Sequence, residues 1–350
     1  MTLNTAIIGC GRIAPNHYLT YQNNPNTIIT WACDLDYHKA QLLAEKLNIP
    51  NATTDIQDVL NDNTVDIVSI LTDHKSHYEL AKTALNHKKH VIVEKPFTLS
   101  IDHAQELISL ALKNRVKLIC ISQHRFDPML NDFRKLIHSD AFGTILLVNA
   151  RLICGRSADY YTESYWHGLA DIDGGSALIN QGYHILDIIL SFFGQPIAMQ
   201  VLAARRHHTE IIETEDTISL QFQFANKAIG SLNITSGWEE EEWDPSIEII
   251  GTKGRIQFDL FYPHRQPVIQ VKGIHAEDFA PRKGRNDAIG INYYGDLHEI
   301  QINDFIDAVV ENRNPLFMPD QALNTLEVIL QAYQIAQDNG FRWGKVTRQT

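Results

Sequence analysis

A glycine motif near the start of the chain, set between a short strand and a helix, constrains the fold more than any other feature. Thr5–Gly9 predicts a buried strand, which runs into the GxGxxA motif Gly9–Ala14 and then into a helix-like stretch. The first glycine permits a tight turn, the second lets the backbone approach a pyrophosphate, and the small Ala14 lets helix and strand pack closely. The phosphates would meet N–H groups at the helix N-terminus. The motif predicts a dinucleotide site, with Gly9, Gly11, Arg12 and Ile13 as candidate cofactor-binding residues.

An acidic residue follows at the distance that such a site requires. The next strand, Ile28–Cys33, ends at Asp34, 20 positions after Ala14. A carboxylate there is placed to bind the adenine-ribose hydroxyls. With Asp36 close by and no adjacent arginine, it would repel a 2′-phosphate, so we expect NAD rather than NADP as the cofactor. The alternative is that Asp34 only caps the end of its strand.

Strands and helices alternate from this motif to about Ser122, which predicts βαβ units and a mostly parallel sheet. From Gly143 the pattern changes to short alternating strands with short connections, typical of an antiparallel sheet. Helices with an apolar stripe return at Leu297–Asn312 and Asp320–Asn339. We therefore predict an α/β protein with two domains. Residues 1–122 form a dinucleotide-binding Rossmann domain, and residues 123–350 form an α+β domain with a large, mostly antiparallel open sheet that binds substrate and mediates oligomerisation.

A lysine stands at the end of one of the predicted buried strands. The strand at Val91–Val93 continues into Glu94-Lys95-Pro96, where the proline stops it. A run this apolar indicates a strand covered on both faces, and ligands of such sheets gather outside the carboxyl ends of the strands. Lys95 is therefore a candidate catalytic residue. The alternative is an ordinary strand-end lysine that reaches for solvent.

The composition narrows the classes of partner. Thirty basic against 42 acidic residues give a net charge of −12, which argues against a nucleic-acid or anionic-membrane surface. No apolar run approaches the roughly 18 residues of a membrane span, and no basic segment suggests a signal peptide. The four cysteines show no metal spacing, so we expect a reduced, cytoplasmic protein without a metal site. A broad sheet with one face uncovered by helices would need a partner, which predicts a homodimer or homotetramer through the C-terminal sheet.

A second polar pattern lies in the stretch after Gly174-Gly175, which predicts a helix opened by Ser176. Asn180 and His184 are four residues apart and would share one face of that helix. Both side chains could then point at one ligand. A metal is a poor interpretation, because there is no HExxH pattern and no third ligand nearby. A buried structural histidine is the alternative.

Taken together, the segments GCGRIA, HKSHYELA, VIVEKP, QHRFDP and GGSALINQGYHILD resemble the Gfo/Idh/MocA oxidoreductases over essentially the whole chain. The resemblance implies that the first domain binds NAD(P) and that the second carries a substrate, commonly a sugar, an inositol or a nucleotide-linked sugar. It implies that Lys95 contacts the substrate hydroxyl and the nicotinamide region. By the same match Glu94 and Pro96 shape the loop, and Thr72 and His77 lie along the cofactor.

One residue departs from the family pattern. Many members carry aspartate where this chain has Asn180; an amide cannot act as a base but can hold a sugar hydroxyl. In this the chain is similar to the WlbA-like branch, whose members oxidise the 3-hydroxyl of a UDP-linked N-acetyl-glucosaminuronic acid. We assign Asn180, Tyr165, Trp166 and Arg125 to the substrate. Arg151, Arg156 and Arg282 are further candidates for binding a carboxylate or pyrophosphate.

The predicted reaction is hydride transfer from a secondary hydroxyl of a sugar, which releases a proton to a base. Lys95 can take this proton only if its pKa falls from about 10.4 toward neutrality. His184 starts near 6.5 and needs no such shift, so either residue, or both together, could be the base. Two alternatives stay open: a free-sugar or inositol dehydrogenase, and a non-catalytic NAD-sensing regulator, against which the retained lysine and histidine argue.

Overall fold

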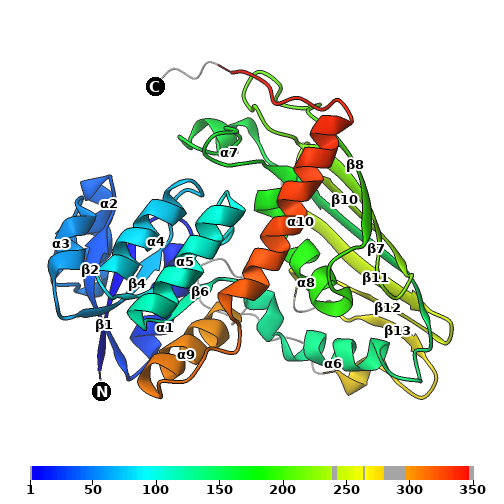
Figure 1. Ribbon diagram of the computed structural model, residues 1–350, viewed down its shortest axis with the longest axis horizontal. Coiled ribbons are helices and arrows are strands. Elements are labelled where there is room, and N and C mark those ends of the chain that lie inside the picture. The colour runs from blue at the N-terminus through cyan, green and yellow to red at the C-terminus, as the bar shows by residue number, and fades with distance from the viewer. Residues whose placement is uncertain (1, 239–242, 263–264, 280–296, 347–350) are drawn as a thin grey trace. The chain divides into compact units, whose positions relative to one another are not determined.

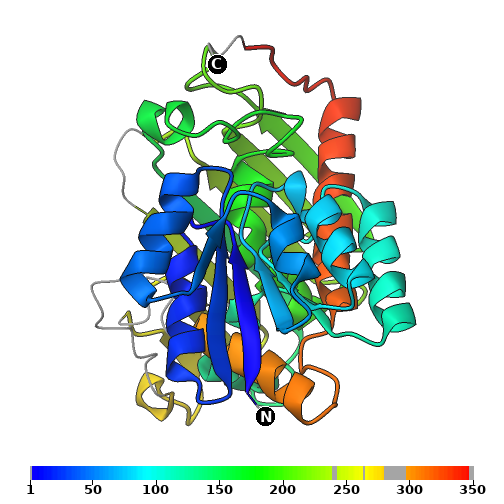
Figure 2. The ribbon, with the colours of Figure 1, turned by 90° about the vertical axis from the view of Figure 1, so that its left-hand side faces the viewer.

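The computed structural model describes residues 2–238, 243–262, 265–279 and 297–346, and it divides the chain into two compact units (Figures 1 and 2). The first unit holds the chain as far as Gln123 and also α9 (Leu297–Val310). The second begins at His124 and includes most of α10 (Pro319–Asp338). The second unit is therefore discontinuous in sequence, because α9 belongs to the first.

The first unit is built on a six-stranded, entirely parallel sheet in the order β3-β2-β1-β4-β5-β6. The chain runs outward from β1 to β3 and then from β4 to β6, so the order reverses between β1 and β4. Right-handed crossovers therefore place α1 and α2 on one face and α4 and α5 on the other. The elements are β1 (Leu3–Ile8), α1 (Ala14–Asn23), β2 (Thr27–Cys33), α2 (Tyr37–Leu47), β3 (Asn51–Thr53), α3 (Ile56–Asn61), β4 (Val65–Ile70), α4 (Ser76–Asn86), β5 (His90–Val93), α5 (Ile101–Asn114) and β6 (Leu118–Cys120).

Helix α9 joins this unit through its apolar stripe. Ile302, Phe305 and Ile306 are buried in the same core cluster as Tyr18 and Tyr21 of α1, beside which α9 packs. The predicted core stripe at Phe305 is thus confirmed. It packs against α1, which lies far away in sequence. Because the stripe would otherwise face water, burial of these side chains holds the late segment against the early one.

The second unit contains a seven-stranded mixed sheet in the order β13-β12-β11-β7-β10-β9-β8, antiparallel except for the parallel pair of β10 with β7. In Figure 1 α6, α8 and α10 lie on one side of this sheet. The predicted fold class is therefore confirmed. The elements are α6 (Pro128–Ile137), β7 (Ile145–Cys154), α7 (Ala158–Thr162), α8 (Tyr183–Phe193), β8 (Ala198–Ala204), β9 (Thr217–Gln223), β10 (Ile229–Thr235), β11 (Trp243–Gly251), β12 (Gly254–Phe258) and β13 (Val268–Val271).

Buried and exposed side chains alternate along these strands, so the sheet has one buried face and one exposed face. In β10, Leu232 and Ile234 are buried, whereas Ile229 points the other way and is exposed. Leu202 on β8 and Val268 on β13 are exposed in the same manner. Within the described residues no helix is both long and apolar enough to cross a membrane.

Candidate active site

The turn after β1 has the geometry that its glycines predict. Gly9 has a φ of +95°, and a Cβ there would lie 2.6 Å from the carbonyl oxygen of Leu71, so the turn after β1 is pressed against the end of β4. A Cβ on Gly11 would meet no described atom within 4 Å. The first glycine is needed for the close approach of the backbone, and the second leaves space above the turn, next to the N-terminus of α1. This combination fits a pyrophosphate.

Asp34 is fixed beside that turn. One carboxylate oxygen accepts the Cys10 N–H at 2.8 Å and the other accepts the Asp36 N–H at 2.9 Å. The side chain therefore does cap the end of its strand, as the alternative interpretation proposed. Each oxygen retains a second lone pair, so the same fixed carboxylate can also accept ribose hydroxyls.

His77 ties together the segments that follow β4 and β5. Its Nδ1 lies 2.7 Å from the Pro96 carbonyl oxygen, and its Nε2 lies 3.3 Å from that of Thr72. Burial, reinforced by the neighbouring His74, lowers the pKa of His77 to about 4, so the ring is neutral near pH 7. The shorter contact assigns its proton to Nδ1, which donates to Pro96. His77 is fully buried and acts on the loop of Lys95 through these backbone contacts.

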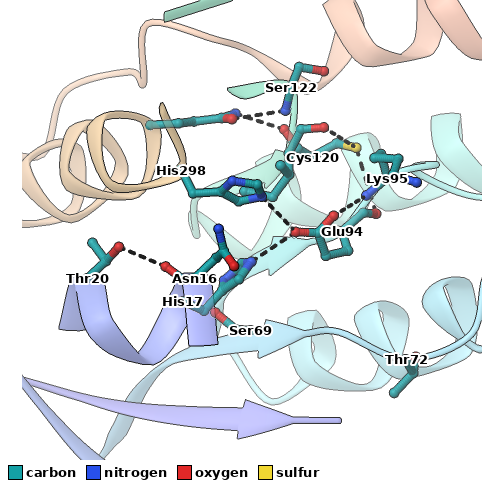
Figure 3. Close-up of polar contacts among 12 residues, drawn as sticks. Asn16, His17, Thr20, Ser69, Thr72, Glu94, Lys95, Cys120, Ser122 and His298 are labelled. Atoms are coloured by element: carbon teal, nitrogen blue, oxygen red, sulfur yellow. Dashed lines mark hydrogen bonds and ion pairs between the residues drawn. The ribbon is translucent and has the colours of Figure 1, made fainter. Parts of the chain in front are cut away.

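The Glu94 carboxylate and the Lys95 side chain lie in different surroundings at the end of β5. Glu94 is buried, and its Oε1 lies 3.0 Å from His17 Nε2 and 3.3 Å from His298 Nε2. Its Oε2 accepts the Lys95 N–H at 3.1 Å. Lys95 is only half-buried, and in Figure 3 its side chain lies outside the group formed by Glu94 and the two imidazoles. The peptide between Lys95 and Pro96 is cis. Glu94 at the strand end thus holds the main chain of Lys95.

In the second unit, the stretch after Ser176 that was expected to be one helix consists of a π-helical turn followed by an α-helix. Residues Ala177–Gly182 make a π-helical turn, and α8 follows at Tyr183. Glu215, fully buried, accepts the N–H of Ser176 at 3.2 Å and that of Leu178 at 2.9 Å, and so anchors the opening of the turn. Single π-turns within helices occur frequently at functional sites, and this one carries Asn180.

Tyr160 gathers the polar groups next to Asn180. Its hydroxyl lies 3.5 Å from Asn180 Nδ2 and 3.1 Å from Gln181 Nε2. The Arg156 guanidinium lies 4.5 Å from its ring centroid, and the His167 ring stacks on it at 4.2 Å. The predicted substrate residue Trp166 packs against His167 at 4.0 Å and so reaches the same cluster, while Tyr165 is exposed.

His184 opens α8 and is 4% exposed. Its ring meets that of His124 edge-on with centroids 5.0 Å apart, and that of Phe261 at 6.0 Å. The imidazole of His184 is thus packed among aromatic rings. Asn180 faces Asp173, whose Oδ1 lies 3.4 Å from its amide nitrogen.

Arg125 is engaged within the protein. Its Nε and Nη2 donate to the two oxygens of Asp187 at 2.8 and 2.7 Å, and Thr325 Oγ1 donates to Asp187 Oδ1 at 2.7 Å. This pair anchors α8, which carries both Asp187 and His184. Arg125 remains a predicted substrate residue with two of its donors committed. Of the other arginines, Arg151 pairs with Asp244 at the surface, Arg156 contacts Gln181 at 2.8 Å, and Arg282 lies outside the described residues.

Two family models match the chain. Residues 3–122 match a model described as an oxidoreductase family with an NAD-binding Rossmann fold, and residues 130–257 match the Gfo/Idh/MocA C-terminal domain. The chain belongs to the Gfo/Idh/MocA family of oxidoreductases. The family that the sequence segments resemble is thereby confirmed, together with an NAD-binding first domain.

The chain is similar to several individual members of this family, and those named for a substrate or ligand differ in that compound. The chain is 32% identical to the uncharacterized oxidoreductase YhhX of Escherichia coli (strain K12), over 56% of this chain and 55% of YhhX, about half the length of that relative. It is 23% identical to levoglucosan dehydrogenase of Pseudarthrobacter phenanthrenivorans, over 88% and 90%. Among solved structures it is similar to the WlbA dehydrogenase from Bordetella pertussis in complex with NADH and UDP-GlcNAcA, with a TM-score of 0.84, 23% identity and coverage of 98% and 97%. At that identity the likeness shows the fold.

Three residues of the site were missed by sequence reasoning. His17 and His298 flank Glu94, and Tyr160 gathers the groups around Asn180. A histidine three positions after the glycine motif was a visible signal for His17. Nothing in the sequence connected it with a histidine some 280 positions later, because that pairing depends on α9 packing beside α1.

We expect the protein to have a lower KM for NAD than for NADP, and Asp34→Ala to reduce this preference roughly tenfold. The Asp34 carboxylate would lie close to a 2′-phosphate, and repulsion between two partly solvated anions reaches this size. Steady-state kinetics with both cofactors measure the ratio. Asp102→Ala, at the start of α5, is the matched control and should leave it unchanged. A lower KM for NADP in the native protein would contradict the assignment.

Proposed function

We propose that this protein transfers a hydride between NAD and a secondary hydroxyl carbon of a sugar. The observation that carries the proposal is the placement of Lys95. Its main-chain N–H is bound by Glu94, and its loop is bound by His77. Lys95 follows the end of β5, at the carboxyl edge of the parallel sheet that carries the glycine turn and Asp34. Ligands of doubly wound sheets bind at this edge.

The chemistry divides between the cofactor and the side chains. When bound, the nicotinamide supplies the redox chemistry. The backbone at Gly9 and Gly11 would hold its pyrophosphate and Asp34 its ribose. Lys95 and His184 are the proposed proton acceptors, and Asn180 is the residue proposed to orient the sugar. A neutral lysine needs a pKa far below its usual 10.4, whereas the ordinary pKa of an imidazole is near 6.5. Both kinds of side chain can therefore serve as the base, alone or as a pair.

The preferred substrate is a UDP-linked N-acetyl-hexosaminuronic acid, oxidised at its 3-hydroxyl. Two features support an anionic sugar. Asn180 offers an amide where many relatives carry a carboxylate, so the site adds no negative charge there. The Arg156 guanidinium lies 4.5 Å from the ring centroid of Tyr160 and 4.7 Å from that of Trp243. It also donates a hydrogen bond to Gln181, the residue after Asn180. A cation held in this way suits a carboxylate. A free sugar is the alternative, favoured by the likeness to levoglucosan dehydrogenase.

A substrate panel with NAD, followed by NADH absorbance, tests the proposal. The panel contains UDP-N-acetyl-glucosaminuronic acid, UDP-N-acetylglucosamine, glucose, levoglucosan and myo-inositol. We expect the highest kcat/KM with the uronic acid, and a loss of about tenfold or more when its carboxylate is absent, the size of one charge-assisted contact. Preference for an unlinked sugar would reject the nucleotide-sugar assignment. NADH binding without turnover of any compound would instead support the non-catalytic regulator.

The outward face of the second unit's sheet is the proposed contact between copies of the chain. Leu202, Ile229 and Val268 are 69%, 55% and 48% exposed on three of its strands. We expect a homodimer or homotetramer in light scattering, and Ile229→Glu combined with Leu202→Glu should shift it toward the monomer, because the charges would be buried at the contact. Leu112→Glu, an exposed leucine on α5 of the first unit, is the control. A monomeric native protein would contradict this assembly.

A further inference from the structure

The start of the π-helical turn Ala177–Gly182 is capped by a residue that lies far away in sequence. A helix leaves its first N–H groups without partners inside the helix, and the side chain of Ser176 does not cap them here. Glu215 does so instead. Its carboxylate accepts the N–H of Ser176 at 3.2 Å and that of Leu178 at 2.9 Å, and its carbonyl oxygen accepts that of Ala177 at 3.3 Å. Three successive N–H groups are thus bound by one residue from the segment before β9.

Tyr333 of α10 completes this cap. Its hydroxyl accepts the Ile179 N–H at 3.1 Å and donates to Glu215 Oε1 at 2.7 Å. A Cβ on Gly175, which has a φ of +144°, would lie 2.0 Å from that hydroxyl oxygen. Glycine is therefore required just before the turn, because it lets the tyrosine reach the backbone of the turn.

The cap buries a carboxyl group at a cost in free energy. Glu215 is 0% exposed and Tyr333 is 4% exposed. Burial raises the pKa of Glu215 to about 7, although the hydrogen bonds from Leu178, Tyr333 and Ser176 act in the opposite direction. Buried ionisable groups often stabilise a fold no better than apolar side chains of similar volume. The cap is therefore better explained by the conformation that it imposes on the turn than by a gain in stability.

That conformation determines where Asn180 lies. The peptide between Ser176 and Ala177 donates its N–H to Glu215, and its carbonyl oxygen accepts the N–H groups of both Asn180 and Gln181 at 3.3 Å. The peptide that the cap fixes is thus the one that holds the backbone of Asn180. A shift of the cap would move the amide side chain with it.

Residues 341–346, which follow the end of α10 (Figure 1), contact both parts of the cap. Trp343 packs against the Tyr333 ring, with the ring centroids 5.3 Å apart. The Gly344 N–H donates to the Glu213 carbonyl oxygen at 2.7 Å, in the segment that also carries the carboxylate of the cap. The C-terminal segment therefore holds the tyrosine through its ring and the acidic segment through its main chain.

We propose that residues 341–346 position the sugar-binding turn, by holding Tyr333 and the segment of Glu215 against the start of the turn that carries Asn180. Tyr333 and Glu215 are positioning residues in this arrangement, because they act on the sugar through the turn. This inference rests on Asn180 contacting the sugar, as in the proposed function.

Tyr333→Phe keeps the ring and removes only the hydroxyl. It leaves the buried Ile179 N–H without its acceptor, so hydrogen exchange in residues 176–182 should accelerate roughly tenfold, the effect of one lost hydrogen bond on a local opening equilibrium. KM for the sugar should rise by about the same factor, while kcat stays within about threefold and NADH affinity is unchanged. Tyr78→Phe is the matched control, because it removes a tyrosine–glutamate hydrogen bond of the first unit, to Glu106 at 2.5 Å. Exchange mass spectrometry and steady-state kinetics measure these quantities.

A stop codon after Gly340 tests the C-terminal segment directly. We expect the same two changes as in Tyr333→Phe, namely faster exchange in the turn and a higher KM for the sugar. A stop codon after Val346 removes only residues 347–350 and should change neither. Two variants at Trp343 decide the question if the shortened chain does not fold. Trp343→Ala should reproduce both changes, and Trp343→Phe, which keeps a ring against Tyr333, should remain close to the native protein.

The outcomes separate this inference from the proposed function. Native exchange rates in Tyr333→Phe and Trp343→Ala would overturn the inference, whatever the activity of the enzyme. Faster exchange with an unchanged KM for the sugar would also overturn it, because the turn would then not position the substrate. If the native protein turns over no sugar, the proposed function fails, and the exchange rates still decide whether the C-terminal segment fixes the turn.

Discussion

Lys95→Met is expected to lower kcat by at least two orders of magnitude while NADH still binds. A positioned acid–base group contributes typically 10²–10⁴-fold to rate, and methionine retains the length and the apolar stem of lysine without its nitrogen. The contact that holds the loop is made by the main chain of Lys95 with Glu94, so the substitution leaves it in place. Steady-state kcat and NADH titration by fluorescence measure the two quantities separately.

Lys113→Met is the matched control for this result. Lys113 is exposed in the last turn of α5, in the same unit, and its loss should change neither kcat nor NADH binding. His184→Gln in the same assay identifies the base. If Lys95→Met keeps a near-native kcat while His184→Gln loses turnover, the proton passes to His184 alone and Lys95 is not the base.

Asp187→Ala is expected to lower the free energy of unfolding by about 3–5 kcal/mol, the cost of breaking a buried ion pair by removing one partner. Asp187 is 2% exposed and accepts two bonds from Arg125 and one from Thr325. Its loss would leave the largely buried Arg125 guanidinium, whose side chain is 15% exposed, without compensation. Chemical unfolding monitored by fluorescence and by circular dichroism measures the change.

The surface pair of Arg151 with Asp244 supplies the comparison. Its side chains are 54% and 45% exposed and lie 2.8 Å apart. Asp244→Ala should cost less than about 1 kcal/mol, as exposed pairs do. Equal losses in the two variants would show that the Arg125 pair is not desolvated as described. Because Asp187 lies one turn after His184 on α8, its loss should also raise KM for the sugar.

The features that the sequence predicted share a local cause. The turn at Gly9, the strand end at Asp34 and the strand that delivers Lys95 each follow from a few adjacent residues, namely glycines where the backbone must approach closely and apolar runs where both faces are covered. The change from parallel to antiparallel strands after Gly143 was visible for the same reason. Parallel strands need helical crossovers, and antiparallel strands need only short turns.

The parts that were missed depend on contacts between distant segments. An apolar stripe predicts that α9 is buried, but it does not say against which partner, so its return to the first unit and the meeting of His298 with Glu94 could not be read from the sequence. The π-turn at Ala177–Gly182 was predicted as an ordinary helix, because helical periodicity does not report the extra residue. Glu215, from the segment just before β9 and some 35 positions later, accepts the hydrogen bonds that anchor the start of this turn.

The late arrival of α9 has a consequence for biosynthesis. The N-terminal sheet leaves the ribosome first, yet the side chains that complete its core, among them Phe305 and Ile306, are made only after more than four-fifths of the polypeptide. Domains usually fold in order during translation, the N-terminal domain first. In this chain the apolar side of α1 stays uncovered until the nascent chain is nearly complete. A stop codon placed after residue 123 would therefore yield an aggregation-prone fragment, and the second unit must be synthesised before the first can become stable.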